Sequence, residues 1–383
     1  MNVVILSPHF PYNQAKFCNH LHHLGVNVLG IDQVDFPPLN CSLKDYRRVS
    51  DLHNSYELIE TVEQLIQRHG AIHRLESNIE YWLKTQADLR TRFNIPGIKL
   101  DQIHKIKRKS EMKKVFLEAG LPAARGRLIP TLESALELAK EVGYPAFIKP
   151  DVGVGSRGCV KINTPEDLVC FFQTPPTEDY IMEEYIEGTL CSFDGLIGRE
   201  GNIIFCSSFI CSRGLAEVVA HELDYYFYTV REIPSDLEAM GRKIVQAFDV
   251  HEGFFHFEFF RKHSDHTFIP IEVNIRAPGG GALDMYNYAC DVDLYLEWAK
   301  VIAGVSEPFQ YERKYYCLTA TRRNNYRYRY SHGEILQRWG DKVLLHEQSE
   351  PINVACMGNY RYIVRSSEFN ELMAMQASIQ ETC

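Results

Sequence analysis

Two short apolar segments with regularly spaced polar residues constrain this chain more than any other feature. They span residues 253–258 and 269–276, and apolar side chains surround their few polar ones. This pattern predicts two buried β-strands. Side chains alternate faces along a strand, so Glu272, Asn274 and Arg276 share one face of the second strand.

If the two strands pair, charged groups from both converge on one face. His256 and Glu258 share a face of the first strand, which would bring Glu258 close to Glu272 and Asn274. Burying such groups is costly unless a cation or an anion compensates them. Oxygen-only ligands suit Mg²⁺, which takes its other oxygens from phosphates. The pattern therefore predicts a magnesium site, with Arg276 beside it for a phosphate or a developing negative charge.

Composition narrows the class of protein. The 383 residues are enough for two or three domains, and 45% of them are hydrophobic. A net charge of −9 argues against a general nucleic-acid binder. Without a run of about 18 apolar residues or a secretion signal, we expect no membrane span and a cytoplasmic location. The eleven cysteines form no Cys-x-x-Cys pair, which favours free thiols over a zinc site.

The first hundred residues alternate between strand and helix patterns. Strands are predicted at residues 3–6, 26–31 and 72–75, and helices at 13–24 and 55–69. This alternation predicts an open parallel sheet.

The polar run Glu76-Ser77-Asn78 follows the last of these predicted strands, where open α/β sheets bind ligands. A polar loop that caps the next helix explains the same residues equally well. The pattern breaks around Pro96-Gly97, where we place a domain boundary.

A glycine-rich loop at residues 153–158 follows a predicted strand that ends near Lys149. Glycines let backbone N–H groups approach a phosphate, and Lys149 is placed to reach it, although a hairpin connection is the plain alternative. The basic run 104–114 is by default a solvated helix face, which could supply one phosphate-binding lysine. Residues 322–330 interleave arginine with tyrosine, and we predict a half-exposed strand there rather than a surface that stacks on nucleic acid.

Taken in order, these segments resemble the ATP-grasp superfamily, in its carboxylate–amine ligase branch. The resemblance covers roughly residues 1–305 and rests on the order and spacing of several motifs. They are Lys109 at a helix start, Phe147-Ile148-Lys149-Pro150, the loop 153–158, Glu183-Glu184-Tyr185-Ile186-x-Gly188, Glu258, and Glu272-x-Asn274-x-Arg276.

The resemblance implies a fold in which ATP lies between two α+β subdomains. The residues implied to contact ATP are Lys109, Lys149, Gly155, Ser156, Arg157, Gly158, Glu183, Glu184, Tyr185 and Ile186. Glu184 and Ile186 would bind the adenine edge through their backbones. Glu258, Glu272 and Asn274 would hold two Mg²⁺ ions, with Mn²⁺ as an alternative ion. Arg276 and Lys149 would act in catalysis.

The implied organisation is an N-terminal α/β domain at residues 1–98 and an ATP-grasp domain at 99–305. The latter divides into a lid at about 110–185 and a metal-binding part at about 186–305, and residues 306–383 form an extension of short strands and a helix. One position departs from the family, because Leu190 stands where many members have a ribose-binding carboxylate. Glu187 and Asp194 are the candidates to replace it.

The implied activity is an ADP-forming ligase that joins a small-molecule carboxylate to an amine, through an acyl phosphate, on amino-acid-like substrates. Rival hypotheses are a carboxylase that uses bicarbonate and a non-catalytic ATP-binding module. A homodimer is the oligomer that the resemblance suggests. The run Pro278-Gly279-Gly280-Gly281 is predicted either to approach an acyl phosphate or to form a tight turn into a helix.

Overall fold

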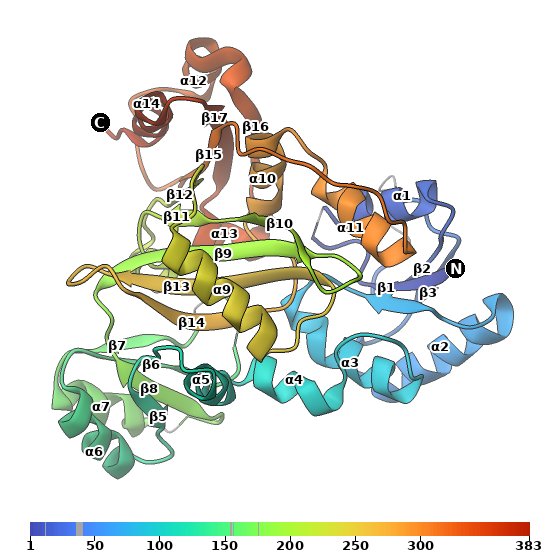
Figure 1. The fold of residues 1–383 in the computed structure, drawn as a ribbon. Helices are drawn as coiled ribbons and strands as arrows, with labels where there is room; N and C mark the ends of the chain where they lie inside the picture. The colour runs from blue at the N-terminus through green and yellow to red at the C-terminus, as the bar shows by residue number, and fades with distance from the viewer. Residues whose placement is uncertain (12, 36–40, 154, 156, 175) are drawn as a thin grey trace.

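The fold of the chain consists of three β-sheets covered by helices (Figure 1). We describe it from a computed structural model, which covers residues 1–383 except for residues 12, 36–40, 154, 156 and 175. A mixed α/β and α+β architecture, with an N-terminal parallel sheet, was expected from the sequence and is confirmed. Among the described residues, no helix has the length and apolar character needed to cross a bilayer.

The N-terminal sheet is entirely parallel, with the strand order β3-β2-β1-β4. Its elements are β1 (Asn2–Leu6), α1 (Gln14–His23), β2 (Asn27–Asp32), β3 (Asp45–Arg48), α2 (Ser55–His69), β4 (Arg74–Glu76), the 3-10 turn Glu80–Trp82 and α3 (Leu83–Arg92). Helix α2 occupies its predicted range because Asn54 caps its start and Gly70, with a φ of +84°, follows its end. Since the strands are parallel, their carboxyl ends lie at one edge of the sheet.

The second sheet is antiparallel, with the order β5-β8-β6-β7, and lies below the large sheet in Figure 1. Helices α4 (Leu100–Lys107) and α5 (Lys109–Glu118) lead into it. Its elements are β5 (Gly126–Leu128), α6 (Leu132–Val142), β6 (Ala146–Pro150), β7 (Val160–Ile162), α7 (Pro165–Gln173) and β8 (Tyr180–Glu184). The predicted strand with Lys149 near its end is therefore β6, and Lys109 begins a helix as expected.

The third sheet has nine strands and includes both segments that opened the sequence analysis. Its order is β14-β13-β9-β11-β12-β15-β17-β16, with β10 on β9. The strands are β9 (Gly188–Ile197), β10 (Ile203–Ser207), β11 (Phe209–Cys211), β12 (Tyr226–Thr229), β13 (Gly253–Lys262), β14 (Phe268–Asn274), β15 (Tyr316–Arg322), β16 (Val343–Gln348) and β17 (Tyr360–Ser366). The helices are α8 (Leu215–His221), α9 (Ser235–Ala247), α10 (Ala282–Cys290), α11 (Leu294–Ala303), α12 (His332–Trp339), α13 (Val354–Met357) and α14 (Phe369–Gln380).

The C-terminal strands extend this large sheet. β15 pairs with β12 and β17, so residues 316–366 add three strands to the sheet that carries β13 and β14. The short strands and final helix expected beyond residue 306 are present, and α14 closes the chain. The domain limits drawn from the sequence remain predictions.

The predicted strand over residues 322–330 is wrong. β15 ends at Arg322, and turns follow it. Arg323 is buried and donates hydrogen bonds to the carbonyls of Leu223, Val354 and Ala355. A buried guanidinium must pair its N–H groups with acceptors, and here the acceptors are backbone carbonyls of other segments. These hydrogen bonds hold the residues after Arg322 in an irregular conformation. Alternation alone could not reveal such partners.

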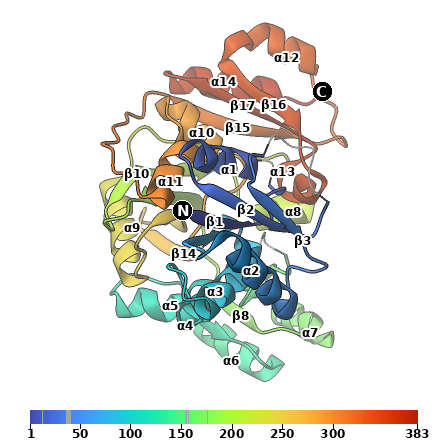
Figure 2. The ribbon, with the colours of Figure 1, turned by 90° about the vertical axis from the view of Figure 1, so that its right-hand side faces the viewer.

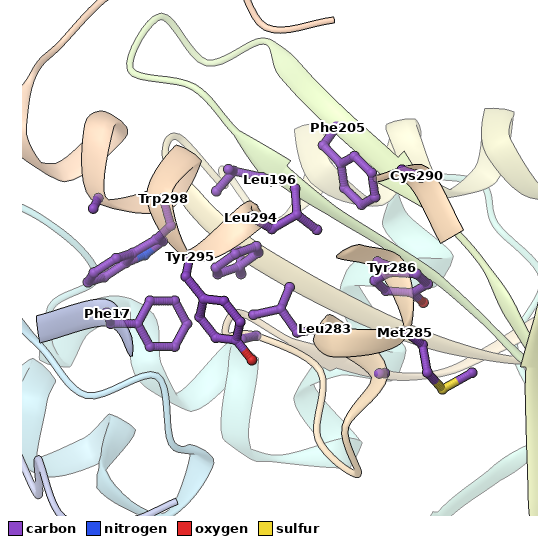
Figure 3. Close-up of a cluster of buried hydrophobic side chains, with 14 of the residues drawn as sticks. Phe17, Leu196, Phe205, Leu283, Met285, Tyr286, Cys290, Leu294, Tyr295 and Trp298 are labelled. Carbon is purple, nitrogen blue, oxygen red and sulfur yellow. The ribbon is translucent and has the colours of Figure 1, made fainter. Parts of the chain in front are cut away.

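An aromatic core joins the N-terminal sheet to the large one. Phe17 of α1 lies between Tyr295 and Trp298 of α11, with ring centroids 4.8 Å apart in both contacts (Figure 3). Figure 2 shows α1 beside α10 and α11 in the turned view. The segment after β4 also lies near the end of β14, because the side chain of Glu80 pairs with that of Arg276.

Candidate functional site

The two polar strands pair as expected, and β9 completes a three-stranded polar face. Glu272 of β14 lies directly opposite Glu258 of β13, and Asn274 lies opposite His256. On the other side of β13, Ser192 and Asp194 of β9 lie opposite Glu258 and His256. Directly opposite residues share a face, so two rows of three polar side chains cross the three strands.

The two carboxylates at the centre of this face have different environments. Burial raises the pKa of Glu272 above its ordinary value, although Lys109 opposes the rise. Burial also tends to raise the pKa of Glu258, but the hydrogen bond with His256 and the charges of His256 and Arg276 together outweigh it and lower that pKa. Lys109 therefore supplies only part of the positive charge that the buried Glu272 needs, and a cation between the two carboxylates would supply more.

His256 lies between two carboxylates in the interior. Its Nδ1 is 2.5 Å from Oδ1 of Asp194, and its Nε2 is 3.2 Å from Oε1 of Glu258. Burial alone would lower the pKa of His256, but the two carboxylates outweigh it and raise the pKa to about 9. At neutral pH, His256 is therefore a cation that donates from both nitrogens.

Asp194 is committed to this network. Its other oxygen accepts hydrogen bonds from Ser192, at 2.5 Å, and from the hydroxyl of Tyr286. Both oxygens of Asp194 are therefore engaged within the protein and the side chain is buried, while the ribose contact considered for it in the sequence stays a prediction. Leu190 shares its face of β9 and is buried, while Glu187 is exposed beside the segment that follows β8.

Both lysines implied to contact phosphates are ion-paired with site carboxylates. Lys109 Nζ lies 3.2 Å from Oε1 of Glu272 and 3.5 Å from the carbonyl oxygen of Gly153. Lys149 Nζ lies 2.7 Å from Oε2 of Glu183, whose other oxygen is 2.6 Å from Lys113.

Glu183 is held by these two lysines. Burial tends to raise its pKa, but Lys149 and Lys113 outweigh it and lower the pKa to about 2. Its side chain therefore fixes the lysines, while its backbone belongs to the segment expected to hold adenine. Lys113 was not singled out in the sequence, since one lysine in a basic run carries no distinguishing signal.

Arg276 is held by a residue of the N-terminal region. Its Nη2 lies 2.7 Å from Oε2 of Glu80 and 3.4 Å from Oδ1 of Asn274. Glu80 also pairs with Lys107 at 2.9 Å. Burial tends to raise the pKa of Glu80, but Arg276 and Lys107 outweigh it and lower the pKa to about 2. The sequence contained no sign of this pair, because its members are 196 residues apart.

The segment expected to bind adenine connects the two sheets. β8 ends at Glu184, whose carboxylate accepts hydrogen bonds from Nε and the backbone N–H of Arg125. Tyr185 and Ile186 follow before β9 begins, and the ammonium of Lys161 lies 4.1 Å from the centre of the Tyr185 ring. Both side chains are partly exposed, and the segment runs from β8 of the second sheet to β9 of the third.

The glycine-rich loop lies next to Lys109. Gly155 and Gly158 have φ values of +66° and +70°, which favour glycine, and Arg157 is exposed. A Cβ atom at Gly158 would come within 2.7 Å of the Tyr180 hydroxyl. Ser156, also predicted to contact phosphate, lies outside the described residues.

The glycine run after Arg276 forms a turn into a helix. α10 begins at Ala282, and Gly280 and Gly281 have φ values of +64° and +82°. A Cβ atom at Gly281 would lie 2.5 Å from Arg361 Nη1, so only glycine fits there without displacing the arginine. The tight turn, one of the two alternatives drawn from the sequence, is present after β14, the strand that carries Glu272; the approach to an acyl phosphate stays a prediction.

The donor set fits a magnesium ion that shares its ligands with phosphates. Among the described residues, no three His, Cys, Asp or Glu side chains are arranged to hold a metal without help. Two facing carboxylates with an amide oxygen beside them are what Mg²⁺ uses when substrate phosphates complete its shell. Glu258, Glu272 and Asn274 would hold such an ion, and its charge would compensate Glu272.

Comparisons with known proteins agree with this geometry. Residues 142–284 match the model of the ATP-grasp domain. The chain is 24% identical, over 294 residues, to the carbamoyl phosphate synthase large chain of Caldanaerobacter subterraneus subsp. tengcongensis, a match that covers 72% of this chain and 26% of that protein. Matches to the curated relatives span between 9% and 26% of their lengths.

Two solved structures share the fold across nearly the whole chain. The L-amino acid ligase from Bacillus licheniformis has a TM-score of 0.77 at 15% identity, covering 99% of this chain and 96% of that one. The N5-carboxyaminoimidazole synthetase from Staphylococcus aureus, complexed with ADP, has a TM-score of 0.76 at 17% identity, covering 99% and 97%. Both alignments extend through the C-terminal strands.

Proposed function

We propose that this chain is an ADP-forming carboxylate–amine ligase, because it is an ATP-grasp protein with the fold of ATP-grasp ligases. Its substrates would be small and amino-acid-like, by analogy with the L-amino acid ligase that shares its fold. The proposal is supported by the position of Glu258 directly opposite Glu272 on neighbouring strands. Lys109 forms an ion pair with Glu272, and Arg276 follows the end of β14.

The proposed reaction has two steps. A carboxylate oxygen of the first substrate attacks the γ-phosphorus of ATP, the bond to the β–γ bridging oxygen breaks, and ADP leaves. The amine nitrogen of the second substrate then attacks the acyl carbon, the carbon–oxygen bond to phosphate breaks, and the nitrogen loses a proton as the amide forms. Such chemistry depends on positioning and charge stabilisation, and it needs no protein nucleophile.

Each charged group of the site would have a part in this scheme. Lys109 and Lys149 would neutralise phosphate oxygens in a site where burial makes the interaction stronger than in water. Arg276, held by Glu80, would stabilise the negative charge that develops at the reacting centre. Mg²⁺ on Glu258, Glu272 and Asn274 would supply electrostatic stabilisation of the transferred phosphoryl group.

A release assay tests the proposal. ADP release is measured over pairs of amino acids, and products are identified by mass spectrometry. We expect ADP release that requires both an acid and an amine, with an amide as product. Strict dependence on bicarbonate would instead indicate a carboxylase, and nucleotide binding without turnover across the panel would indicate a binding module.

A variant pair tests the metal assignment. Glu272→Ala should reduce ADP release by roughly 10²–10³-fold, because it removes one of the two facing carboxylates. Glu63→Ala, an exposed glutamate of α2, is the matched control and should retain full activity. If Glu272→Ala retained full turnover, the metal assignment would be wrong.

A further inference from the structure

A chain of hydrogen bonds between buried side chains runs from helix α10 through the large sheet to Glu258. Its members are Tyr286, Asp194, Ser192 and His256, which are 1%, 1%, 0% and 5% exposed. The reaction proposed for the site uses Glu258 but gives these four residues no part. Polar groups are costly to bury even when they are paired, so a network of this kind beside a site carboxylate indicates a function.

Asp194 is the centre of the network and accepts hydrogen bonds at both oxygens. Oδ2 accepts from the hydroxyl of Ser192, at 2.5 Å, and from that of Tyr286, while Oδ1 lies 2.5 Å from Nδ1 of His256. The Ser192 oxygen in turn accepts from the backbone N–H of Phe209 at 3.2 Å, which directs its hydroxyl proton to Asp194. An ionised carboxylate can only accept, so His256 carries a proton on Nδ1.

His256 transmits this constraint to Glu258. With Nδ1 directed to Asp194, its Nε2 lies 3.2 Å from Oε1 of Glu258 and donates to it. The ring of Phe209 stacks on the imidazole, with centroids 5.8 Å apart and planes at 29°, which restricts rotation of the imidazole. Oε1 of Glu258 is therefore held, while no described residue donates a hydrogen bond to Oε2. The Glu258 side chain is 23% exposed, so a cation from solvent can reach it.

We propose that this network positions Glu258 as a metal ligand, by holding Oε1 so that Oε2 is left for the cation. The four residues are positioning residues, because they act on the cation only through Glu258. Loss of such an outer partner of a ligating carboxylate typically lowers metal affinity by roughly 10–100-fold. Tyr286 belongs to α10, so the network also links the helix after the glycine turn to the metal ligand. The inference rests on the proposed function, which assigns Glu258 to Mg²⁺.

The test is metal binding without turnover. Mn²⁺, which takes the same oxygen ligands as Mg²⁺, is titrated into the full-length protein with ADP below the protein concentration, and free Mn²⁺ is followed by EPR. His256→Leu should weaken Mn²⁺ binding by roughly 10–100-fold, because it removes the donor to Glu258. Its affinity for ADP in a chelator should not change. His256→Gln keeps an N–H that can donate toward Glu258, and it should bind Mn²⁺ about fivefold more tightly than His256→Leu.

The remote end of the network is tested by Tyr286→Phe. This change keeps the ring and removes one donor to Asp194, so it should weaken Mn²⁺ binding by about three- to tenfold. Tyr295→Phe is the matched control, because it removes a hydroxyl that donates to a different buried carboxylate, Asp284, in the same aromatic core (Figure 3). The control should bind Mn²⁺ as the natural protein does. Tyr286→Phe also decides the matter if His256→Leu does not fold.

Failure of this inference is distinguishable from failure of the proposed function. If the natural protein binds ADP but no Mn²⁺, the metal assignment fails and the network loses its role with it. If the natural protein binds Mn²⁺ and both His256→Leu and Tyr286→Phe bind it equally well, only the positioning role is overturned. Equal losses of Mn²⁺ affinity in Tyr286→Phe and Tyr295→Phe, or a parallel loss of ADP affinity in the chelator, would indicate a general structural role and would also overturn it.

Discussion

The charge on His256 makes a specific prediction about how stability depends on pH. The pKa of this buried histidine is raised from 6.5 to about 9 by Asp194 and Glu258, against the effect of burial. At about 1.4 kcal/mol per pH unit, that rise corresponds to about 3 kcal/mol of stabilisation of the folded state. The whole contribution is present below pH 6.5, because His256 is then protonated in both folded and unfolded chains. It is lost progressively as the pH rises from 6.5 through about 9.

The measurement compares the natural protein with His256→Gln by urea unfolding between pH 6 and pH 9.5, in buffer that contains a chelator. His256→Gln should be the less stable protein at pH 6, and the difference should shrink by about 3 kcal/mol by pH 9.5. His263→Gln serves as the control, because His263 is exposed near the end of the same strand and contacts Thr189 instead of a carboxylate.

A difference between the two proteins that stays constant over this pH range would refute the reasoning. A titration of the imidazole of His256 by NMR gives an independent check. If that ring titrated near its ordinary pKa of 6.5, the two carboxylates would not hold the charge as the geometry indicates.

Three further outcomes are expected. Arg276→Lys should lower turnover by roughly 10²–10³-fold, because lysine keeps the positive charge but cannot form the forked contacts of a guanidinium. The affinity for ATP should stay nearly unchanged, and a loss of ATP binding in calorimetry would contradict this. Glu183→Ala should destabilise the protein by about 3 kcal/mol, since it leaves the buried Lys149 without its ion-pair partner. An unfolding midpoint equal to that of the natural protein would contradict this. Gly241→Ala should cost about 1–3 kcal/mol in urea unfolding, because a Cβ there would come within 2.0 Å of the Phe193 ring.

Local sequence patterns were sufficient to predict many elements of the fold. The alternation of apolar and polar residues predicted both strands and the side chains that share a face of each. The grouping of Glu258, Glu272 and Asn274 was expected only on the condition that the two strands pair, which they do. The helix at residues 55–69 was predictable because its capping residues are adjacent to it. These predictions depend on interactions between close neighbours in the sequence.

The remaining features depend on contacts between distant segments. Asp194 reaches His256 across 62 residues, and Glu80 reaches Arg276 across 196. The turns after Arg322 are held by carbonyls of segments that no sequence pattern links to them. Such partners become visible only when the order of strands in the sheets is known.

The contact between Glu80 and Arg276 has a consequence for protein engineering. The arginine proposed to act in catalysis is neutralised by a carboxylate that lies outside the segment matched by the ATP-grasp family model. A shortened chain that began at residue 99 would retain every proposed ligand of ATP and metal, but Arg276 would lose this counter-ion. Exchange of the segment before residue 99 between relatives would therefore preserve the ion pair of Arg276 only if the donor supplied an acidic residue at the place of Glu80.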